Sequence, residues 1–426
     1  MDKATDKAVD SAPSSTHPEG ARTAGLARTF LSLRHRDFRF LWMGTLSAGA
    51  ALWIQQVTLG WLVYTLTGSA IQLGLINGMR TLPVWFMAPL AGVLADRWNR
   101  RPLLIGVEAI LAVGAFLFAL DVARGWVQVW HVYTFAFLMG CGTSFYQTLR
   151  QAAVPSTVPR VDLMNAIALS SAAFNFTRIL GPAVGGALIA LVGMAGNFFI
   201  QAGCYVWSAV SMASIRTPLP PGGEGRTQPI HRSFLEGVRY VQRDKQLLSL
   251  IVIGLLPFLL AMPVNSLMPI FAKDVLGMGP EGLGLLLSSL GGGALLGSLM
   301  LATMGNVRRK GLVAFLGLAM MGAGLVLFGF SRWLPLSIAL LITVGAGQMT
   351  FMASNNTLIQ MVVSDHYRGR VMSIYSLDQG LVPLGSLLAG VLATYITAPW
   401  AVVSMGGCLL LLGLAAAVAL PSVRRL

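Results

Sequence analysis

Residues 92–102 read GVLADRWNRRP, a short charged turn set between two long apolar stretches. Gly92 and Ala95 are small enough to let neighbouring helices approach closely. Asp96 adds a carboxylate at the edge of the apolar stretch. Three arginines follow this carboxylate: Arg97, Arg100 and Arg101. The stretch therefore predicts a turn between two membrane-spanning helices, with small residues, one acid and several bases concentrated at one point.

Outside this turn the chain is strongly apolar. Of its 426 residues, 55% are hydrophobic and 11% are charged, and the mean hydropathy is +0.71. Soluble domains carry about 25% charged residues, so these charges cannot cover a water-facing surface. The 3 cysteines lie in apolar runs without a CxxC pair, which predicts neither a disulfide framework nor a metal site. We predict an all-α membrane protein that holds no metal and no cofactor.

Twelve apolar stretches are long enough to cross a bilayer, which needs about 20 residues per helix. They cover residues 39–66, 70–95, 102–122, 128–149, 163–192, 196–215, 247–271, 281–304, 311–330, 334–361, 370–395 and 399–420. Residues 1–30 lack an apolar run and predict a disordered cytoplasmic tail without a signal peptide. We expect two pseudo-symmetric six-helix bundles, residues 31–215 and 247–420. Residues 216–246 form the linker, with a short surface helix, and 421–426 form a second tail.

Lys and Arg are distributed unevenly between the loops. Of the 30 such residues, 25 fall in the termini and the even-numbered loops, whereas Arg124, Lys273 and Arg332 fall on the opposite face. By the positive-inside rule both termini are cytoplasmic. The net charge of +14 therefore reports membrane orientation. Nucleic-acid binding would need a basic surface with stacking aromatic residues, so we expect a lipid bilayer and no nucleic acid as partner.

The two halves resemble each other at a nearly constant offset. Arg100 and Arg101 have counterparts in Arg308 and Arg309, and the Leu-Gly-Pro run at 180–182 resembles later Leu-Gly-Ser residues. Weak internal symmetry is typical of secondary transporters, which bind substrate near the membrane midplane between the repeats. Chance similarity between apolar helices is the alternative.

The turn at 92–102 resembles the signature loop of the major facilitator superfamily, G-x-x-x-D-R-x-x-R-R. In that family the acid contacts the N-terminus of the eleventh helix, where an anion is favoured, and the arginines hold the halves together in the outward-open state. The resemblance implies the twelve-helix fold of that family. It also implies a conformational gate at these positions: Gly92, Asp96, Arg97, Arg100 and Arg101. The alternative, positive-inside anchoring alone, leaves the glycine and the acid unexplained.

A second motif lies in the fifth predicted span, where residues 178–188 read RILGPAVGGAL. It resembles the fifth-helix motif of the antiporters in this superfamily, and the matching positions are Gly181, Pro182, Gly185 and Gly186. Its small residues suit close helix packing. Together with residues 30–44 and 95–104, the chain looks like the branch that contains the enterobactin exporter and related drug or macrolide efflux proteins.

This resemblance implies efflux of a small amphipathic compound across the bacterial inner membrane by alternating access with proton antiport. The compound would be a siderophore, a macrolide or another drug, and the protein would act as a monomer. Two departures weigh against the usual proton route. The stretch FAFLMGCG at 135–142 lacks the arginine that many drug/proton antiporters carry, and the first span has no carboxylate.

Four charged residues lie within the predicted spans: Arg80, Glu108, Arg178 and Asp378. Each charge at mid-bilayer costs about 2.5–3.5 kcal/mol and therefore requires a role. Asp378 is the first candidate for proton coupling and Glu108 the second, although the position of Glu108, one to two turns from Arg97–Arg101, favours a structural role as partner of those arginines. Arg80 could pair with Asp378 across the halves. Arg178 could meet an anionic substrate or bond to helix carbonyls.

Predicted spans 1, 4, 7 and 10 line the substrate cavity in this fold. With the two arginines, their mid-span polar residues form the candidate lining: Gln55, Gln56, Arg80, Thr143, Ser144, Tyr146, Arg178, Asn265, Gln348, Asn355 and Asn356. A wide and weakly polar cavity suits an amphipathic organic molecule. The alternative is that half of these amides serve helix–helix contacts.

Other functions are less well supported. An importer or uniporter would share the fold, but the glycine motif of the fifth span argues against it. An enzyme would need a catalytic cluster at membrane depth, and none is visible. A scaffold or sensor would normally carry a large soluble domain. No GxxxxGK[ST] loop is present, so ATP is not the expected energy source.

Overall fold

The computed structural model describes residues 30–219, 230–305 and 309–424. Within these ranges the chain forms helices joined by turns and contains no strand, as the all-α prediction requires. The predicted tail at 1–30 lies almost entirely outside the described residues, as does the middle of the predicted linker at 216–246.

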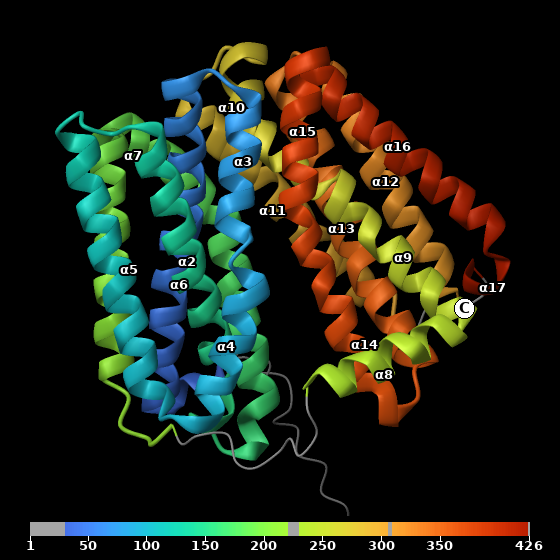
Figure 1. Cartoon of the computed structure of the whole chain (residues 1–426), viewed down its shortest axis with the longest axis horizontal. Helices are drawn as coiled ribbons and strands as arrows, with labels where there is room; N and C mark the ends of the chain where they lie inside the picture. The colour runs from blue at the N-terminus through green and yellow to red at the C-terminus, as the bar shows by residue number, and fades with distance from the viewer. Residues whose placement is uncertain (1–29, 220–229, 306–308, 425–426) are drawn as a thin grey trace, which may run out of the picture.

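The first bundle contains the helices that precede the linker. They are η1 (Leu31–Arg34), α2 (Arg36–Thr67), α3 (Ala70–Thr81), α4 (Val84–Arg97), α5 (Arg100–Ala123), α6 (Val129–Ala153), η2 (Val154–Ser156), η3 (Arg160–Asp162) and α7 (Leu163–Ala213). We call this set the N bundle. In Figure 1 it is the blue and green group of long helices on the left.

The second bundle contains the helices that follow the linker. They are α8 (Ile230–Arg243), α9 (Lys245–Leu260), η4 (Met262–Leu267), α10 (Met268–Ile270), η5 (Phe271–Val275), α11 (Pro280–Thr303), α12 (Lys310–Phe330), α13 (Leu334–Val362), α14 (Asp365–Tyr375), η6 (Ser376–Leu381), α15 (Val382–Ile396), α16 (Ala398–Ala419) and α17 (Pro421–Arg424). We call this set the C bundle. It is the yellow to red group on the right of Figure 1.

Three interruptions shape the long helices. α7 is continuous by hydrogen bonding but bends at Gly193, whose φ of 74° and ψ of 175° are not helical; glycine reaches this conformation without the Cβ clash of other residues. The predicted second span is divided into α3 and α4 near Pro83, where no N–H is available. The predicted eleventh span is divided by η6. The last two breaks lie in helices that face each other across the bundles.

Within the described residues, nine helices are long and apolar enough to cross a membrane. The predicted count of twelve is therefore not reproduced by length and composition alone. The 54 residues from Arg160 to Ala213 count once although they bend at Gly193, and α15 has only 15 residues. α6 is absent from the nine; it carries His, Gln and several Thr among its 25 residues.

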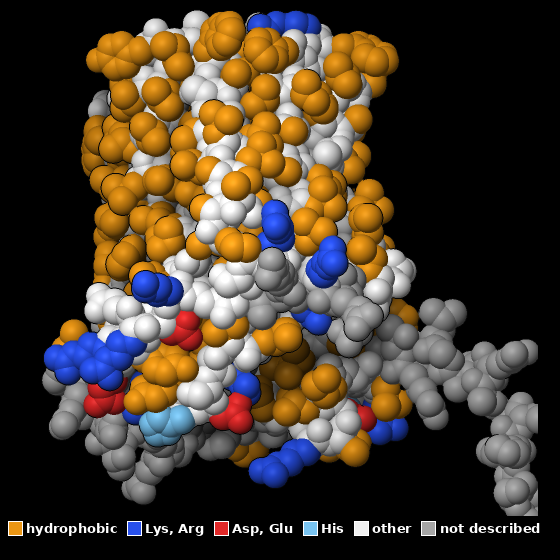
Figure 2. All heavy atoms as spheres, turned by 90° about the vertical axis from the view of Figure 1, so that its right-hand side faces the viewer, with side chains coloured by type: hydrophobic (Ala, Val, Ile, Leu, Met, Phe, Trp, Pro, Cys, Tyr) orange, Lys and Arg blue, Asp and Glu red, His pale blue; other side chains and the backbone are white. Residues whose placement is uncertain are grey.

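The outer surface fits a bilayer. Figure 2 shows one side of the C bundle, where hydrophobic side chains cover most of the upper part and charged side chains gather at the lower end. Exposed large apolar residues are numerous on the helices, as Ile110, Leu191 and Val418 illustrate with exposures of 71%, 79% and 77%. Such a surface is stable in lipid and not in water.

The two ends of the molecule differ. We call the end that carries Arg97, Arg100, Arg101, Arg150 and Arg160 the arginine end, and the opposite end the far end. The bundles pack together toward the far end, where α3 lies beside α15, and diverge toward the arginine end, where α4 and α14 lie (Figure 1). The predicted surface helix corresponds to α8, which packs on α14 through the stacked rings of Tyr240 and Tyr367, 4.3 Å apart.

Candidate functional site

Glycines bring the two bundles together at the far end. A Cβ built on Gly74 of α3 would lie 2.3 Å from the carbonyl oxygen of Ser386 on α15. A Cβ on Gly186 of α7 would lie 3.1 Å from the Cα of Gly284 on α11. Both contacts involve backbone, which cannot move aside as a flexible side chain can. Small residues are therefore required at these two crossings.

Polar contacts also cross between the bundles. Asn77 donates to Ser386 Oγ at 2.7 Å, and the backbone N–H of Ala183 donates to Ser288 Oγ at 2.9 Å. Closest to the far end, the hydroxyl of Tyr64 on α2 donates to the carboxylate of Asp274 in the π-helical segment η5. The ammonium of Lys273 lies 5.5 Å from the centre of the Tyr64 ring, within cation–π range.

The fifth-span motif behaves as a packing surface. A Cβ on Gly181 would lie 2.6 Å from Cβ of Trp53, and one on Gly185 would lie 3.2 Å from Cα of Ile54, both on α2. Gly186 faces the C bundle instead. Pro182 is buried within the helix. One face of this motif therefore packs α7 against α2 of the N bundle, and the opposite face packs it against α11 of the C bundle.

The arginines of the 92–102 turn contact their own bundle in this conformation. Arg100 donates to the carbonyl of Ala95 at 3.2 Å and to that of Ala152 at 2.7 Å, and Arg101 donates to the carbonyl of Ala213 at 2.5 Å. The last carbonyls of a helix have no intrahelical partner and carry partial negative charge. These side chains therefore cap helix ends in the N bundle.

The other residues of the turn face open space. Asp96 and Arg97 are exposed, Trp98 is 60% exposed, and a Cβ on Gly92 would meet no atom within 4 Å. The close helix approach predicted for Gly92 is absent here because the bundles diverge at this end. The gate assignment of this turn stays a prediction about another conformation.

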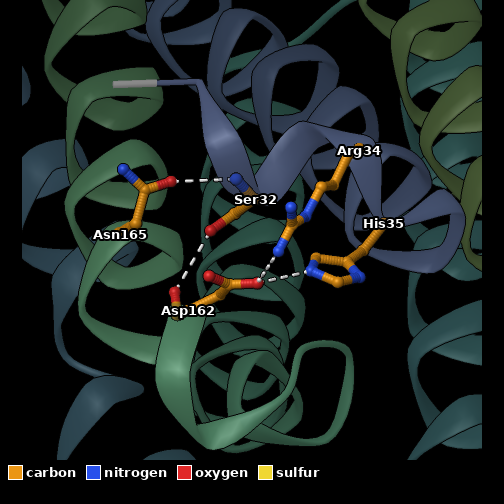
Figure 3. A network of polar contacts seen from close by, with 5 residues as sticks. All are labelled: Ser32, Arg34, His35, Asp162 and Asn165. Carbon is orange, nitrogen blue, oxygen red and sulfur yellow. Dashed lines mark hydrogen bonds and ion pairs between the residues drawn. The ribbon is translucent and has the colours of Figure 1, made fainter. Parts of the chain in front are cut away.

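A polar network fastens η1 to η3 and α7 at the arginine end. Figure 3 shows Asp162 surrounded by residues of η1 and its C-cap. Its carboxylate contacts Arg34 Nη2 at 3.1 Å and His35 Nε2 at 2.7 Å, and its backbone carbonyl accepts from Ser32 Oγ at 3.1 Å (Figure 3). Asn165 accepts from the Ser32 backbone N–H at 2.9 Å. Asp162 is 2% exposed.

A pocket lies between the bundles, with about 490 Å³ of non-atom space that includes its opening to solvent. The N bundle contributes Gln56, Asn77 and Arg80 to its wall, and the C bundle contributes Asn265 and Ser266. The rest of the lining is mainly apolar: Leu59, Gly60, Leu73, Ile76, Pro269, Leu283 and Leu287. Three of the predicted cavity residues, Gln56, Arg80 and Asn265, therefore meet in one pocket. Asn77 and Ser266 were not predicted, because a lone polar residue on an apolar helix gives no directional signal.

The remaining predicted cavity residues lie elsewhere. Gln55 accepts from Gln201 at 2.8 Å inside the N bundle, and Asn355 donates to the carbonyl of Leu250 inside the C bundle. Asn356 is hydrogen-bonded to Gln360, one turn further along α13. These three amides make contacts within their own bundle. This agrees with the alternative that some amides of the spans serve helix packing.

The polar residues of α6 line a separate small pocket within the N bundle. Thr143, Tyr146, Gln147 and Arg150 lie in its wall. The hydroxyls of Thr143 and Ser144 donate to carbonyls one turn earlier in α6, to Met139 O at 2.8 Å and to Gly140 O at 2.7 Å. Arg150 was predicted only as a loop charge, yet it is buried and donates to Gln147 at 3.0 Å.

Glu108 is fully buried in the N bundle. One carboxyl oxygen accepts from Ser208 at 2.6 Å, and the other has no hydrogen-bond partner among the described residues. The hydroxyls of Tyr146 and Tyr205 are likewise buried without a described partner. Glu108 forms no ion pair among the described residues, and Arg100 and Arg101 donate to helix carbonyls, so the alternative pairing of Glu108 with the arginines of the 92–102 turn is not formed in this conformation.

Asp378 lies in η6, the break between α14 and α15, and is 4% exposed. Tyr375, the last residue of α14, precedes it by one helical turn. Arg80 makes its hydrogen bonds to Gln56 and Asn77 and forms no ion pair among the described residues. The predicted Arg80–Asp378 pair is therefore not formed in this conformation.

Two helical bundles with an apolar outer surface, joined at one end around a pocket, define a membrane transporter. The chain matches the transmembrane secretion effector family over residues 27–425 and belongs to it. The predicted resemblance to efflux proteins of the major facilitator superfamily is thereby confirmed. The family and its relatives are transporters, so the prediction of a transporter rather than an enzyme is also confirmed.

Similar proteins are efflux and siderophore transporters. The chain is 30% identical over 397 residues to the multidrug efflux pump Tap of Mycolicibacterium fortuitum, covering 89% of this chain and 95% of that protein. It is 26% identical over 366 residues to macrolide efflux protein A of Streptococcus pyogenes, covering 84% and 89%. It is 26% identical over 349 residues to the staphyloferrin A transporter of Staphylococcus aureus, covering 80% and 85%.

Among solved structures, the D323A mutant of the nucleoside transporter NupG has a TM-score of 0.73 at 14% identity, covering 90% of this chain and 99% of that one. At this identity the likeness establishes the fold, which is that of a major facilitator-type transporter, and nothing about the substrate.

Proposed function

We propose that this protein exports a small amphipathic organic compound from the cytoplasm by alternating access. The pocket between the bundles is the observation that carries the proposal: it joins residues of both halves, and the halves are packed together on one side of it and diverge on the other. A transporter that rocks about such a site exposes it to each face in turn. The efflux activity named for its relatives supports the outward direction.

The proposal includes the membrane arrangement. Twelve spans follow if α7 crosses twice through its bend at Gly193 and if α6 and the α14–α15 segment each cross once. The arginine end would then face the cytoplasm, with both termini there, in the plasma membrane of a bacterium. The protein would act as a monomer, and the pocket would face the cytoplasm in the conformation described here.

Proton antiport is the energy source we infer. Two buried carboxyls inside the bundles support it, Asp378 in the broken eleventh span and Glu108 in the N bundle. Broken helices near the midplane are common at coupling sites. A carboxyl that changes its surroundings between two conformations can bind a proton from one side and release it to the other. Siderophores, macrolides and other drugs remain the candidate cargoes.

The function can be tested by expressing the protein in cells that lack their own efflux pumps. Lowered accumulation of macrolides, siderophores or dyes would support export, and raised accumulation would favour the importer alternative. No change for any compound would favour a scaffold or sensor.

Coupling is tested in proteoliposomes with an imposed pH gradient. Asp378→Asn should abolish gradient-driven uptake into these proteoliposomes while substrate binding persists. Asp365→Asn, which alters an acid 88% exposed at the arginine end, is the matched control and should transport normally. Full coupling in Asp378→Asn would remove this residue from the mechanism.

A further inference from the structure

Two arginines of the spans direct their hydrogen bonds to amides only. Arg80 donates to Gln56 Oε1 at 3.3 and 3.4 Å and to Asn77 Oδ1 at 3.2 Å, and Arg178 donates to Gln348 Oε1 at 3.2 Å. Neither arginine forms an ion pair within the described part of the chain. A charge in the low-dielectric interior is costly without an opposite charge, and amide oxygens compensate it only in part.

The two arginines lie on different helices, Arg80 on α3 and Arg178 on α7. Gln56, which accepts from Arg80, lies one turn along α2 from Trp53. Trp53 in turn contacts α7 at Gly181, three residues after Arg178. The partner of Arg178, Gln348, belongs to α13 of the C bundle. Arg80 therefore lines the pocket, whereas Arg178 joins the two bundles through Gln348 and is not part of the pocket wall.

The acidic residues of the neighbourhood are engaged elsewhere. Glu108 is enclosed within the N bundle against Ser208. Asp274 accepts from Tyr64 at the far end. Asp96 is exposed at the arginine end, and Asp378 lies beside Tyr375 in η6. Neither guanidinium group therefore has a carboxylate among its described contacts. The pocket offers hydrogen-bond donors and an apolar wall.

We propose that this pocket takes an amphipathic organic anion, whose carboxylate binds the guanidinium group of Arg80. The inference deepens the proposed function and rests on it. A guanidinium pairs with a carboxylate through two parallel hydrogen bonds, which are stronger than those to a neutral amide. Gln56 and Asn77 hold Arg80 until the anion arrives. Leu73, Leu283 and Leu287 line the space for the apolar part of the molecule.

The test compares three ligands that share one fluorophore and differ in charge. Dansylglycine is an anion, dansylamide is neutral and dansylcadaverine is a cation near pH 7. The protein is placed in nanodiscs of phosphatidylcholine, so that the bilayer adds no net charge, and binding is followed by dansyl fluorescence. We expect dansylglycine to bind about tenfold more tightly than dansylamide, the effect of one charge-assisted hydrogen bond. Equal binding, or tighter binding of the cation, overturns the proposal.

Variants separate a binding role from a structural one. Arg80→Gln should reduce the preference for dansylglycine, and Arg80→Lys should keep part of it. Arg332→Gln, which alters an exposed arginine at the far end, should keep all of it. A binding role predicts that Arg80→Gln unfolds at the same or a higher temperature, because a buried charge has been removed. A lower unfolding temperature with equal loss of all three ligands would mean that Arg80 is structural.

The outcome is distinguishable from failure of the exporter proposal. If cells export only neutral or cationic compounds and dansylglycine does not bind, the anion site is excluded while export stands. If dansylglycine binds as expected but no compound is exported in either direction, the anion site stands and the exporter proposal fails.

Discussion

The two ends of the molecule differ most clearly along the predicted second span, residues 70–95. Gly74, toward the far end, lies so close to Ser386 that a Cβ would be 2.3 Å from its carbonyl oxygen. Gly92, toward the arginine end, has no atom within 4 Å of the same position. Both glycines belong to the N bundle, Gly74 on α3 and Gly92 on α4. One is in contact and the other is not, which is expected if the halves rock and close one end at a time.

Polar residues repeat this contrast. At the far end the side chains of Tyr64 and Asn77 bond to the opposite bundle. At the arginine end Arg100 and Arg101 bond to carbonyls of their own bundle. For these arginines to bind the C bundle when the arginine end closes, they would have to leave their acceptors in the N bundle. Each conformation would then have contacts that are lost in the other.

The largest expected effect comes from filling the closest glycine contact. Gly74→Val should keep α3 and α15 apart, because the new side chain meets backbone. Transport should then fall about 100-fold, the order seen when an element is misplaced by about 1 Å. Gly106→Val is the control, because Gly106 has open space around it. Normal transport by Gly74→Val would mean that this crossing does not close during the cycle.

A smaller effect is expected from the far-end hydrogen bond. Tyr64→Phe removes the hydroxyl that donates to Asp274 and keeps the ring under Lys273. Loss of one bond to a partly solvated carboxylate costs about 1 kcal/mol, so the population open at the far end should rise roughly fivefold. Spin-label distances between the far ends of α2 and α11 measure this shift. Tyr395→Phe, at an 82% exposed ring, should leave the distances unchanged.

The sequence was informative where backbone geometry or charge left a local signal. The turn at 92–102, the small face of α7 and the amphipathic α8 were all visible, because each depends on residues adjacent in sequence or one helical turn apart. The break in the second span carried a signal in Pro83, since proline disrupts the helix interior. Gly193 likewise marks the junction of two predicted spans.

The direction of polar side chains could not be read in the same way. Gln55 and Gln56 are neighbours, yet one faces Gln201 inside the bundle and the other faces the pocket. Helices that are apolar all round give no preferred face, so neither amide could be assigned. Glu108 meets Ser208, a residue 100 positions away. Such a partner follows from helix packing, which the sequence of one helix does not contain.

The Asp162 network at the arginine end offers a test within one bundle. Asp162→Asn removes the charge that Arg34 and His35 share and should release η1 from α7 (Figure 3). Amide hydrogen exchange at residues 31–35 should accelerate about tenfold, as expected for loss of a buried charge-assisted bond, while exchange within α15 stays the same. Unchanged exchange at 31–35 would show that the contacts of Ser32 alone hold this segment.

The smallest effect should come from the same substitution at an exposed acid of the same end. Asp365 pairs with Arg368 at 2.6 Å, closer than Asp162 lies to Arg34, but the two side chains are 88% and 47% exposed. Water solvates both charges whether or not they touch, and surface pairs of this kind contribute little. Asp365→Asn should therefore change local hydrogen exchange in α14 by less than about twofold. An effect as large as that of Asp162→Asn would mean that pairing, and not burial, sets the strength of contacts at the arginine end.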